Sequence, residues 1–202
     1  FNIAEGMFGI AREAQIPALL DAYEIPYVFS DAFTLAISLD KGLTKTIIRE
    51  HGIPTADFFV LKQIEDIDKV DLPYPLFAKP IAEGTGKGIK ANSKITDKAQ
   101  LKTVCENLLK EFKQPVLIET FLSGDEFTVG ITGTGEDAKI VAVMEIILGK
   151  KAEAEIYSYS NKDNYEDRVS YKLAPEEISK KCEEVALSAW KALGCRDGGR
   201  VD

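Results

Sequence analysis

The chain has 202 residues, of which 45% are hydrophobic and 29% are charged, and its formal net charge is −8 at pH 7. This composition is ordinary for a globular protein of one or two domains, and the acidic balance argues against a general nucleic-acid or anionic-membrane binder. A local basic pocket for a nucleotide is still compatible with it. No apolar run approaches the roughly 20 residues that span a bilayer, so we expect no membrane partner.

The cysteine and histidine content bounds the redox and metal chemistry. Cys105, Cys182 and Cys195 lie far apart and are odd in number, which favours reduced, inert thiols in a cytoplasmic protein. His51 is the single histidine, so a histidine-rich zinc site is excluded. It is followed by Gly52, as expected for a cation near the end of a helix.

The first 52 residues have the pattern of the tail of an α/β unit that leads into a further helix. Short apolar runs predict strands, and apolar residues at helical spacing predict helices. The expected elements are a strand at 1–4, a helix at 12–24, a strand at 26–29, a helix capped by Ser30 or Asp31 that runs to Leu39, and a helix from Asp40 to Gly52.

The rest of the chain alternates strands with two long helices. One helix has Asp97 as its N-cap and an apolar face from Leu101 to Phe112, and the other has an apolar face from Ile178 to Leu193 and ends at Gly194. The other expected elements are strands at 58–62, 73–80, 115–122, 126–133 and 138–148, a long loop at 149–172, and a strand that begins at 198. A chain that stops in a buried strand is expected to be a fragment.

The stretch "FAKPIAEGTGKGIK" places Gly84, Gly86 and Gly88 directly after an apolar strand that ends in Lys79. Clustered glycines lose much backbone entropy on folding and are typical of loops whose N–H groups approach phosphate. The stretch is not a Walker A loop, because Lys87 is followed by glycine, and it is not the G-x-G-x-x-G dinucleotide fingerprint. We interpret Lys79 as aimed at phosphate rather than as a solvent-exposed strand end.

Three further features are ambiguous by themselves. Lys41 lies in the first turn of its helix, where a cation opposes the macrodipole and a solvated side chain is the plain interpretation. The stretch "ETFLSGDEF" (119–127) fits an acidic hairpin, or a hinge that binds a base and places a carboxylate at sugar hydroxyls. Arg200 and Asp202 share one face of a strand, either as an ion pair or as an anion clamp with a magnesium ligand.

Taken in order, these features resemble the ATP-grasp superfamily, and specifically the D-alanine–D-alanine ligase family. "FAKPIAEGTGKGI" is similar to that family's lysine strand and phosphate-covering loop, "LIETFLSGDEFTVGI" to its adenine hinge, and "LGCRDGGRVD" to its arginine–aspartate strand. The resemblance extends over nearly all of the chain. It implies an α/β (α+β) protein with the tail of an α/β pre-ATP-grasp domain at 1–39, a first ATP-grasp lobe at 40–114, and a second, truncated lobe at 115–202.

The resemblance also implies a role for each matching residue. The residues expected to contact ATP are Lys41, Lys79, Glu83, Gly84, Thr85, Gly86, Gly88, Glu119, Phe121, Leu122 and Glu126. The lysines would bind phosphates, 83–88 would cover them, 119–122 would hold adenine, and Glu126 would hold the ribose. Arg200 and Lys162 are the expected catalytic residues, with Arg200 stabilising the transferred phosphate, and Asp202 would bind Mg²⁺.

The implied reaction is ATP-dependent ligation through an acyl phosphate, which an amine then attacks. D-Alanine would serve as both substrates, for peptidoglycan precursor synthesis. Positioning, Mg²⁺ and cationic clamps would supply most of the catalysis, which suits a chain without a Ser-His-Asp or Cys-His constellation. The expected cofactors are therefore ATP and Mg²⁺, the expected partners are small molecules, and a homodimer is the default that the family suggests.

Two alternatives stay open at this stage. Thr85 and Asp163 stand where the family often has serine and tyrosine, so another acceptor, such as D-lactate or a different amino acid, is compatible with the sequence. The family's remaining Glu and Asn metal ligands fall beyond Asp202, and most of its N-terminal domain is missing. We therefore expect the fragment to be weak or inactive, and a non-catalytic nucleotide-binding module remains an alternative. Lys87 is either an accessory contact or a solvated side chain.

Overall fold

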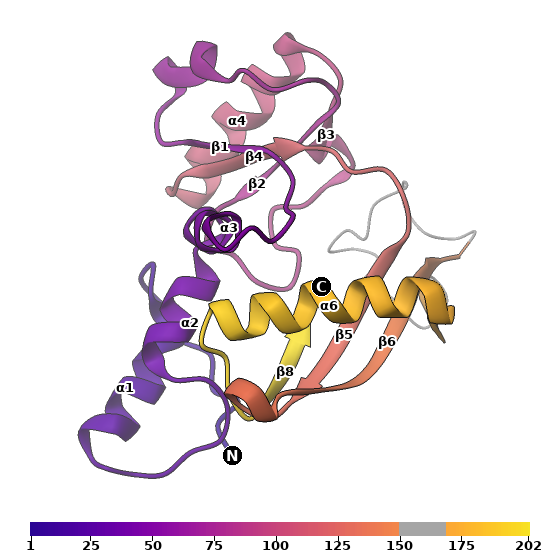
Figure 1. Cartoon of the computed structure of the whole chain (residues 1–202). Helices are drawn as coiled ribbons and strands as arrows, with labels where there is room; N and C mark the ends of the chain where they lie inside the picture. The colour runs from indigo at the N-terminus through magenta and orange to yellow at the C-terminus, as the bar shows by residue number, and fades with distance from the viewer. Residues whose placement is uncertain (150–168) are drawn as a thin grey trace. The chain divides into compact units, whose positions relative to one another are not determined.

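The computed structural model describes residues 1–149 and 169–202, which form two antiparallel four-stranded sheets (Figure 1). Contacts divide the chain into two compact units. Unit 1 comprises Phe1–Thr55, Asp125–Ile146 and Tyr171–Asp202, and unit 2 comprises Ala56–Gly124 with the described residues between Ile147 and Ser170. These two units are defined by contacts within the chain, whereas the three domains were predicted from the family resemblance. The domain boundaries after residues 39 and 114 therefore stay a prediction.

Sheet A has the strand order β1-β4-β2-β3, and helix α4 covers one of its faces. The elements are β1 (Phe58–Leu61), β2 (Leu76–Pro80), β3 (Lys94–Ile95), α4 (Lys98–Phe112) and β4 (Val116–Thr120). Asp97 caps α4 as predicted, because its side chain accepts a hydrogen bond from the Gln100 N–H. Leu101, Val104 and Leu108 pack onto the sheet as one face of the helix.

Cys105 lies in the core between α4 and sheet A. It is fully buried, and this burial raises the pKa of its thiol to about 12, so the thiol stays protonated at neutral pH. Burial also raises the pKa of Cys182 and of Cys195 above the ordinary thiol value. All three cysteines are free, in agreement with the expectation of reduced, unreactive thiols.

Sheet B has the strand order β7-β6-β5-β8, and helix α6 lies along one of its faces (Figure 1). The elements are β5 (Glu126–Thr132), β6 (Lys139–Leu148), β7 (Val169–Leu173), α6 (Glu176–Ala192) and β8 (Gly198–Val201). Trp190 of α6 packs onto Val129 and Ile131. Gly199 lies under this indole, where an added Cβ would approach the Trp190 ring to 2.9 Å, which explains a glycine in the strand.

The remaining elements are short. The helices are α1 (Gln15–Ala22), α2 (Ala32–Leu39) and α3 (Lys41–Glu50), with 3₁₀ turns η1 (Arg12–Ala14), η2 (Ile64–Lys69), η3 (Ala91–Ser93) and η4 (Gly135–Asp137). Of the two candidate caps for α2, Asp31 accepts the bond from the Thr34 N–H. In the described part of the chain, no helix is both long and apolar enough to cross a bilayer.

The strands predicted at 1–4 and 26–29 are wrong, because both segments are irregular. Phe1 and Ile3 are largely exposed, and an apolar run forms a strand only where a neighbouring strand pairs with it. Phe29 has a φ of 83°, outside the strand region, and its N–H is bound by the Asp197 carboxylate. The loop predicted for 149–172 is also wrong at its end, where β7 pairs at the edge of sheet B. Val169, Tyr171 and Leu173 alternate with polar residues there, but the strand is largely exposed and forms through its pairing with β6, which no local pattern shows.

Candidate functional site

The predicted site residues divide between the two units. Unit 2 holds Lys79, the glycine loop (residues 81–90) and the hinge residues 119–122. Unit 1 holds Lys41, Glu126, Arg200 and Asp202. Lys162 and Asp163 lie outside the described residues. Each group is described below by its own geometry, and the two groups are called here the first and the second half-site.

The first half-site is the face of sheet A that α4 does not cover, called here open face A. Leu76 and Ala78 are buried against α4, so the intervening Phe77 and Lys79 project from the opposite face. The register places Glu119 opposite Phe77. The Lys79 Nζ and the Glu119 Oε1 are 2.5 Å apart, and these side chains are only 21% and 13% exposed. The structure thus brings together two of the predicted residues.

Sequence reasoning missed a second cation on open face A. Lys94 pairs with Phe77, which pairs with Glu119 on β4, so the three residues form a row across β3, β2 and β4. The Lys94 Nζ lies 4.4 Å from the centre of the Phe121 ring, which is 6.3 Å from the Phe77 ring. An aromatic surface with two ammonium groups suits a planar ligand that carries negative charge. Only the sheet register reveals Lys94, because its strand has two residues and is too short to show a sequence pattern.

The hinge backbone is already partly bonded. The Phe121 N–H donates to the Pro75 carbonyl at 2.9 Å, and the Thr120 N–H donates to the Asp57 carbonyl at 2.9 Å. A contact from Phe121 to adenine would therefore use its carbonyl group. The neighbouring Leu122 is 71% exposed. The adenine role of these residues remains a prediction, now restricted to particular backbone atoms.

The glycine loop follows β2 and turns tightly at its tip. The Lys87 N–H donates to the Gly84 carbonyl, and the Ile89 N–H donates to the Gly86 carbonyl, both at 3.0 Å. Thr85, at φ 53°, and Gly86, at φ 78°, both adopt left-handed conformations. Thr85 and Lys87 are exposed at this tip. The predicted phosphate contacts thus lie on an accessible turn.

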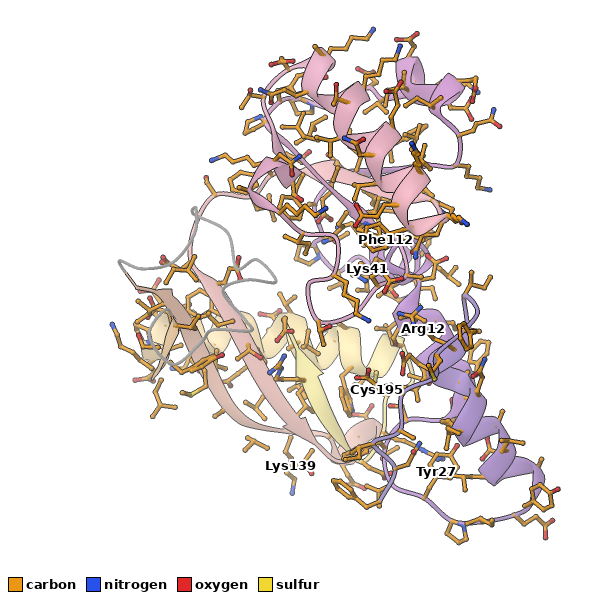
Figure 2. The ribbon with its side chains drawn as sticks, turned by 180° about the vertical axis from the view of Figure 1, so that it is seen from behind. Arg12, Tyr27, Lys41, Phe112, Lys139 and Cys195 are labelled. Atoms are coloured by element: carbon orange, nitrogen blue, oxygen red, sulfur yellow. The ribbon has the colours of Figure 1, made fainter. Side chains whose placement is uncertain are left out.

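Gly88 is the glycine that the loop most needs, and its replacement by alanine is expected to destabilise unit 2. Its φ is 80°, and an added Cβ would lie 2.5 Å from the Pro80 Cγ and 3.0 Å from the Cζ of Phe112, the last residue of α4, which is labelled in Figure 2. We expect Gly88→Ala to lower the free energy of unfolding by about 1–3 kcal/mol. The matched control is Gly84→Ala, because Gly84 faces open space. Urea unfolding of both variants measures the difference, and equal stability would contradict the steric argument.

The second half-site is the face of sheet B opposite α6, called here open face B. Val129 and Ile131 face α6, so Glu126 and Thr128 point to the other side, together with Arg200, whose partner in the register is Gly130. The Thr128 hydroxyl donates to the Asp202 Oδ1 at 2.5 Å. Thr128 is buried, and no sequence motif marks it.

Arg200 and Asp202 form an ion pair on open face B, which was one of the two interpretations of "GRVD". The Arg200 Nε is 3.1 Å from the Asp202 Oδ1, and the Arg200 Nη2 is 3.2 Å from the Asp202 Oδ2. The side chains are 64% and 54% exposed, so the pair contributes little stability and can rearrange around a ligand. Within the described residues, no group of three or more His, Cys, Asp or Glu side chains could hold a metal ion. The single carboxylate of Asp202 fits Mg²⁺, which needs few protein ligands when phosphate oxygens complete its shell.

Lys41, which Figure 2 labels, is the first residue of α3. Asp40 caps this helix by accepting a hydrogen bond from the Leu43 N–H at 2.9 Å. Lys41 is half-buried, which differs from the fully solvated lysine that is usual in a first turn. Its phosphate role remains a prediction.

Comparison with known proteins identifies the family to which this chain belongs. Residues 47–202 match the family model described as "D-ala D-ala ligase C-terminus". The chain is 33% identical over 202 residues to a D-alanine–D-alanine ligase of Ralstonia pickettii, an alignment that covers 98% of this chain and 58% of that protein. The chain thus spans little more than half of the length of this relative.

Solved structures agree with the sequence match. A D-alanine–D-alanine ligase of Bacillus anthracis complexed with ATP aligns with a TM-score of 0.71 and 26% identity, over 94% of this chain and 58% of that one. The VanG D-Ala:D-Ser ligase of Enterococcus faecalis aligns with a TM-score of 0.74 and 25% identity, over 93% of this chain and 54% of that one. These similarities show an ATP-grasp fold with two α+β lobes, as the sequence predicted. The chain belongs to the D-alanine–D-alanine ligase family.

Proposed function

We propose that the full protein carrying this chain is an ATP-dependent carboxylate–amine ligase that joins two D-alanine molecules for peptidoglycan precursors. The observation that carries the proposal is open face A. There, Lys79 and Glu119 meet next to the glycine loop in a chain of this family. A planar base and an anionic tail are the two chemistries that this face suits.

The roles of the first half-site follow from its chemistry. The Lys79 ammonium would leave Glu119 to neutralise an ATP phosphate, and the tip of the glycine loop would present backbone N–H groups to the same anion. The Phe121 carbonyl would accept a hydrogen bond from the adenine amino group. Lys94 would add positive charge beside the base.

The roles of the second half-site follow from open face B. Glu126 would accept hydrogen bonds from the ribose hydroxyls. Arg200 would stabilise negative charge that develops on the transferred phosphate and on the tetrahedral intermediate, because a guanidinium donates two parallel hydrogen bonds. Asp202 would be one ligand for Mg²⁺, which supplies charge neutralisation at the phosphates when bound. Lys41 would contact a phosphate, and Lys162 the substrate side.

A ligase with a different acceptor is the second candidate. The similarity to a D-Ala:D-Ser ligase favours it, as do Thr85 and Asp163 at positions where the family often has serine and tyrosine. Both candidates share the acyl-phosphate step and differ only in the nucleophile. For either, we further propose a cytoplasmic protein, since ATP and peptidoglycan precursors are handled inside the cell. We also propose that it assembles as a homodimer, which is the default that the family suggests.

The test is an ADP-release assay of the full-length protein with ATP, Mg²⁺ and a panel of acceptors. We expect fastest turnover with D-alanine, and mass spectrometry should find D-alanyl-D-alanine. Faster turnover with D-serine or D-lactate would favour the second candidate. No ADP release with any member of the panel would leave only a nucleotide-binding module. The gene sequence after Asp202 separates this last case, since an active ligase needs further carboxylate or amide ligands for Mg²⁺.

A further inference from the structure

Gln114 connects the glycine loop to the start of β4. This half-buried residue lies between α4 and β4, and its side chain reaches back more than 30 residues in sequence. The Gln114 Oε1 accepts a hydrogen bond from the Ala82 N–H at 2.7 Å. The Gln114 Nε2 donates to the Glu83 Oε1 at 2.8 Å. One side chain therefore binds two successive residues at the entrance of the loop.

The chemistry of these two contacts requires an amide. The Ala82 N–H needs an acceptor and the Glu83 carboxylate needs a donor, so the orientation of the Gln114 amide is fixed by its partners. Methionine of similar length would satisfy neither, and glutamate would accept from Ala82 but repel Glu83. Ala82 is almost fully buried, so the loss of its acceptor would leave a buried N–H unpaired.

Other contacts hold both ends of the loop. The Ile81 N–H donates to the Pro115 carbonyl at 3.0 Å. At the far end, Gly88 packs directly onto Pro80. Between these points, the Lys87 N–H bonds to the Gly84 carbonyl within the tip, one further bond joins the Gly86 carbonyl to the Ile89 N–H, and the space beside Gly84 is open.

We propose that Gln114 is a positioning residue of the nucleotide site, which anchors Ala82 and Glu83 so that only Gly84–Lys87 move when the loop closes over phosphate. The inference rests on the proposed function, because it assumes that the loop closes over a nucleotide. It also changes the expected role of Glu83, which would be held in place at the start of the loop and would not belong to the segment that moves.

Trypsin cleavage after Lys87 tests the anchor directly. Lys87 is exposed, but proteases need a longer extended segment than a tight tip offers, so the anchored loop should be cut slowly. In the full-length protein without nucleotide, we expect Gln114→Met to raise the rate of cleavage after Lys87 by about three- to tenfold, the effect of losing one or two hydrogen bonds. The KM for ATP should rise by a similar factor, while kcat changes less than twofold.

A double variant that exchanges the amide of Gln114 and the carboxylate of Glu83 provides the decisive test. Gln114→Glu alone should speed cleavage, because it places two carboxylates together. The double variant Gln114→Glu with Glu83→Gln restores one amide and one carboxylate, and it should return cleavage to within about twofold of wild type if the pair is the anchor. The matched control is Gln100→Met, which removes a glutamine of unit 2 whose Oε1 accepts from Thr96 near the other end of α4. This control should leave cleavage unchanged.

The outcomes separate the inference from the proposed function. Cleavage of Gln114→Met and Gln114→Glu at the wild-type rate would overturn the anchor, as would a double variant cut as fast as Gln114→Glu. If Gln114→Met does not fold, the glutamate variant and the swap decide alone. Protection of wild-type Lys87 by Mg²⁺ and a non-hydrolysable ATP analogue is a separate readout. Its absence would contradict the proposed function, while the nucleotide-free cleavage rates would still decide the role of Gln114.

Discussion

Replacement of Lys79 by methionine is expected to weaken ATP binding by about 10- to 100-fold, the usual effect of losing a charge-assisted hydrogen bond to phosphate. The side chain lies on open face A, at the end of β2 and directly before the glycine loop. Methionine keeps the length of the side chain and removes its charge. Isothermal titration of the full-length protein with an ATP analogue and Mg²⁺ measures the change.

The effect of Lys79→Met on protein stability has to be separated from its effect on ATP affinity. Lys79 pairs with Glu119, and both side chains are mostly buried, so the variant leaves a carboxylate without its cation and should lower the melting temperature. Lys69→Met is the matched control, because Lys69 of the same unit pairs with Asp66 at the surface, with a 2.6 Å contact. A folded Lys79→Met protein with ATP affinity within twofold of wild type would contradict our assignment of Lys79.

Replacement of Arg200 by alanine is expected to lower kcat by about 10²- to 10³-fold, the effect of removing one preorganised donor from a developing anion. Its pair with Asp202 is more than half exposed, so the free energy of unfolding should change by less than about 1 kcal/mol. The rate loss would therefore report on chemistry rather than on folding. ADP release at saturating ATP measures it.

The control for Arg200 breaks another exposed ion pair of unit 1. Lys180 pairs with Glu176 on α6 at 2.7 Å, and Lys180→Ala should leave both kcat and stability unchanged. Arg200→Lys keeps the charge but loses the bidentate geometry, and it should fall between wild type and alanine. A kcat within threefold of wild type for Arg200→Ala would remove Arg200 from the proposed chemistry.

Most helices and paired strands could be predicted from the sequence, because their caps and their apolar periodicity lie within a short stretch of the chain. Asp97 and Asp40 cap helices through their own side chains, and the apolar periodicity of α4 and α6 is set by the faces that they bury. The strands at 1–4 and 26–29 were wrong because strand formation depends on a partner that is distant in sequence. For the same reason β7, an exposed edge strand, was missed.

The family of this protein and the order of its candidate site residues can be recognised without a structure, because the lysine strand, the glycine loop, the hinge and "GRVD" are short motifs of fixed chemical character. Which of these residues lie next to one another depends on the folded chain. Sheet register places Glu119 opposite Phe77 and within reach of Lys79, and it adds Lys94 and Thr128, which no motif marks. The Gln114 contacts likewise join residues more than 30 positions apart. Such pairings arise from hydrogen-bonded registers and chain reversals, so they are properties of the folded chain and not of any local stretch.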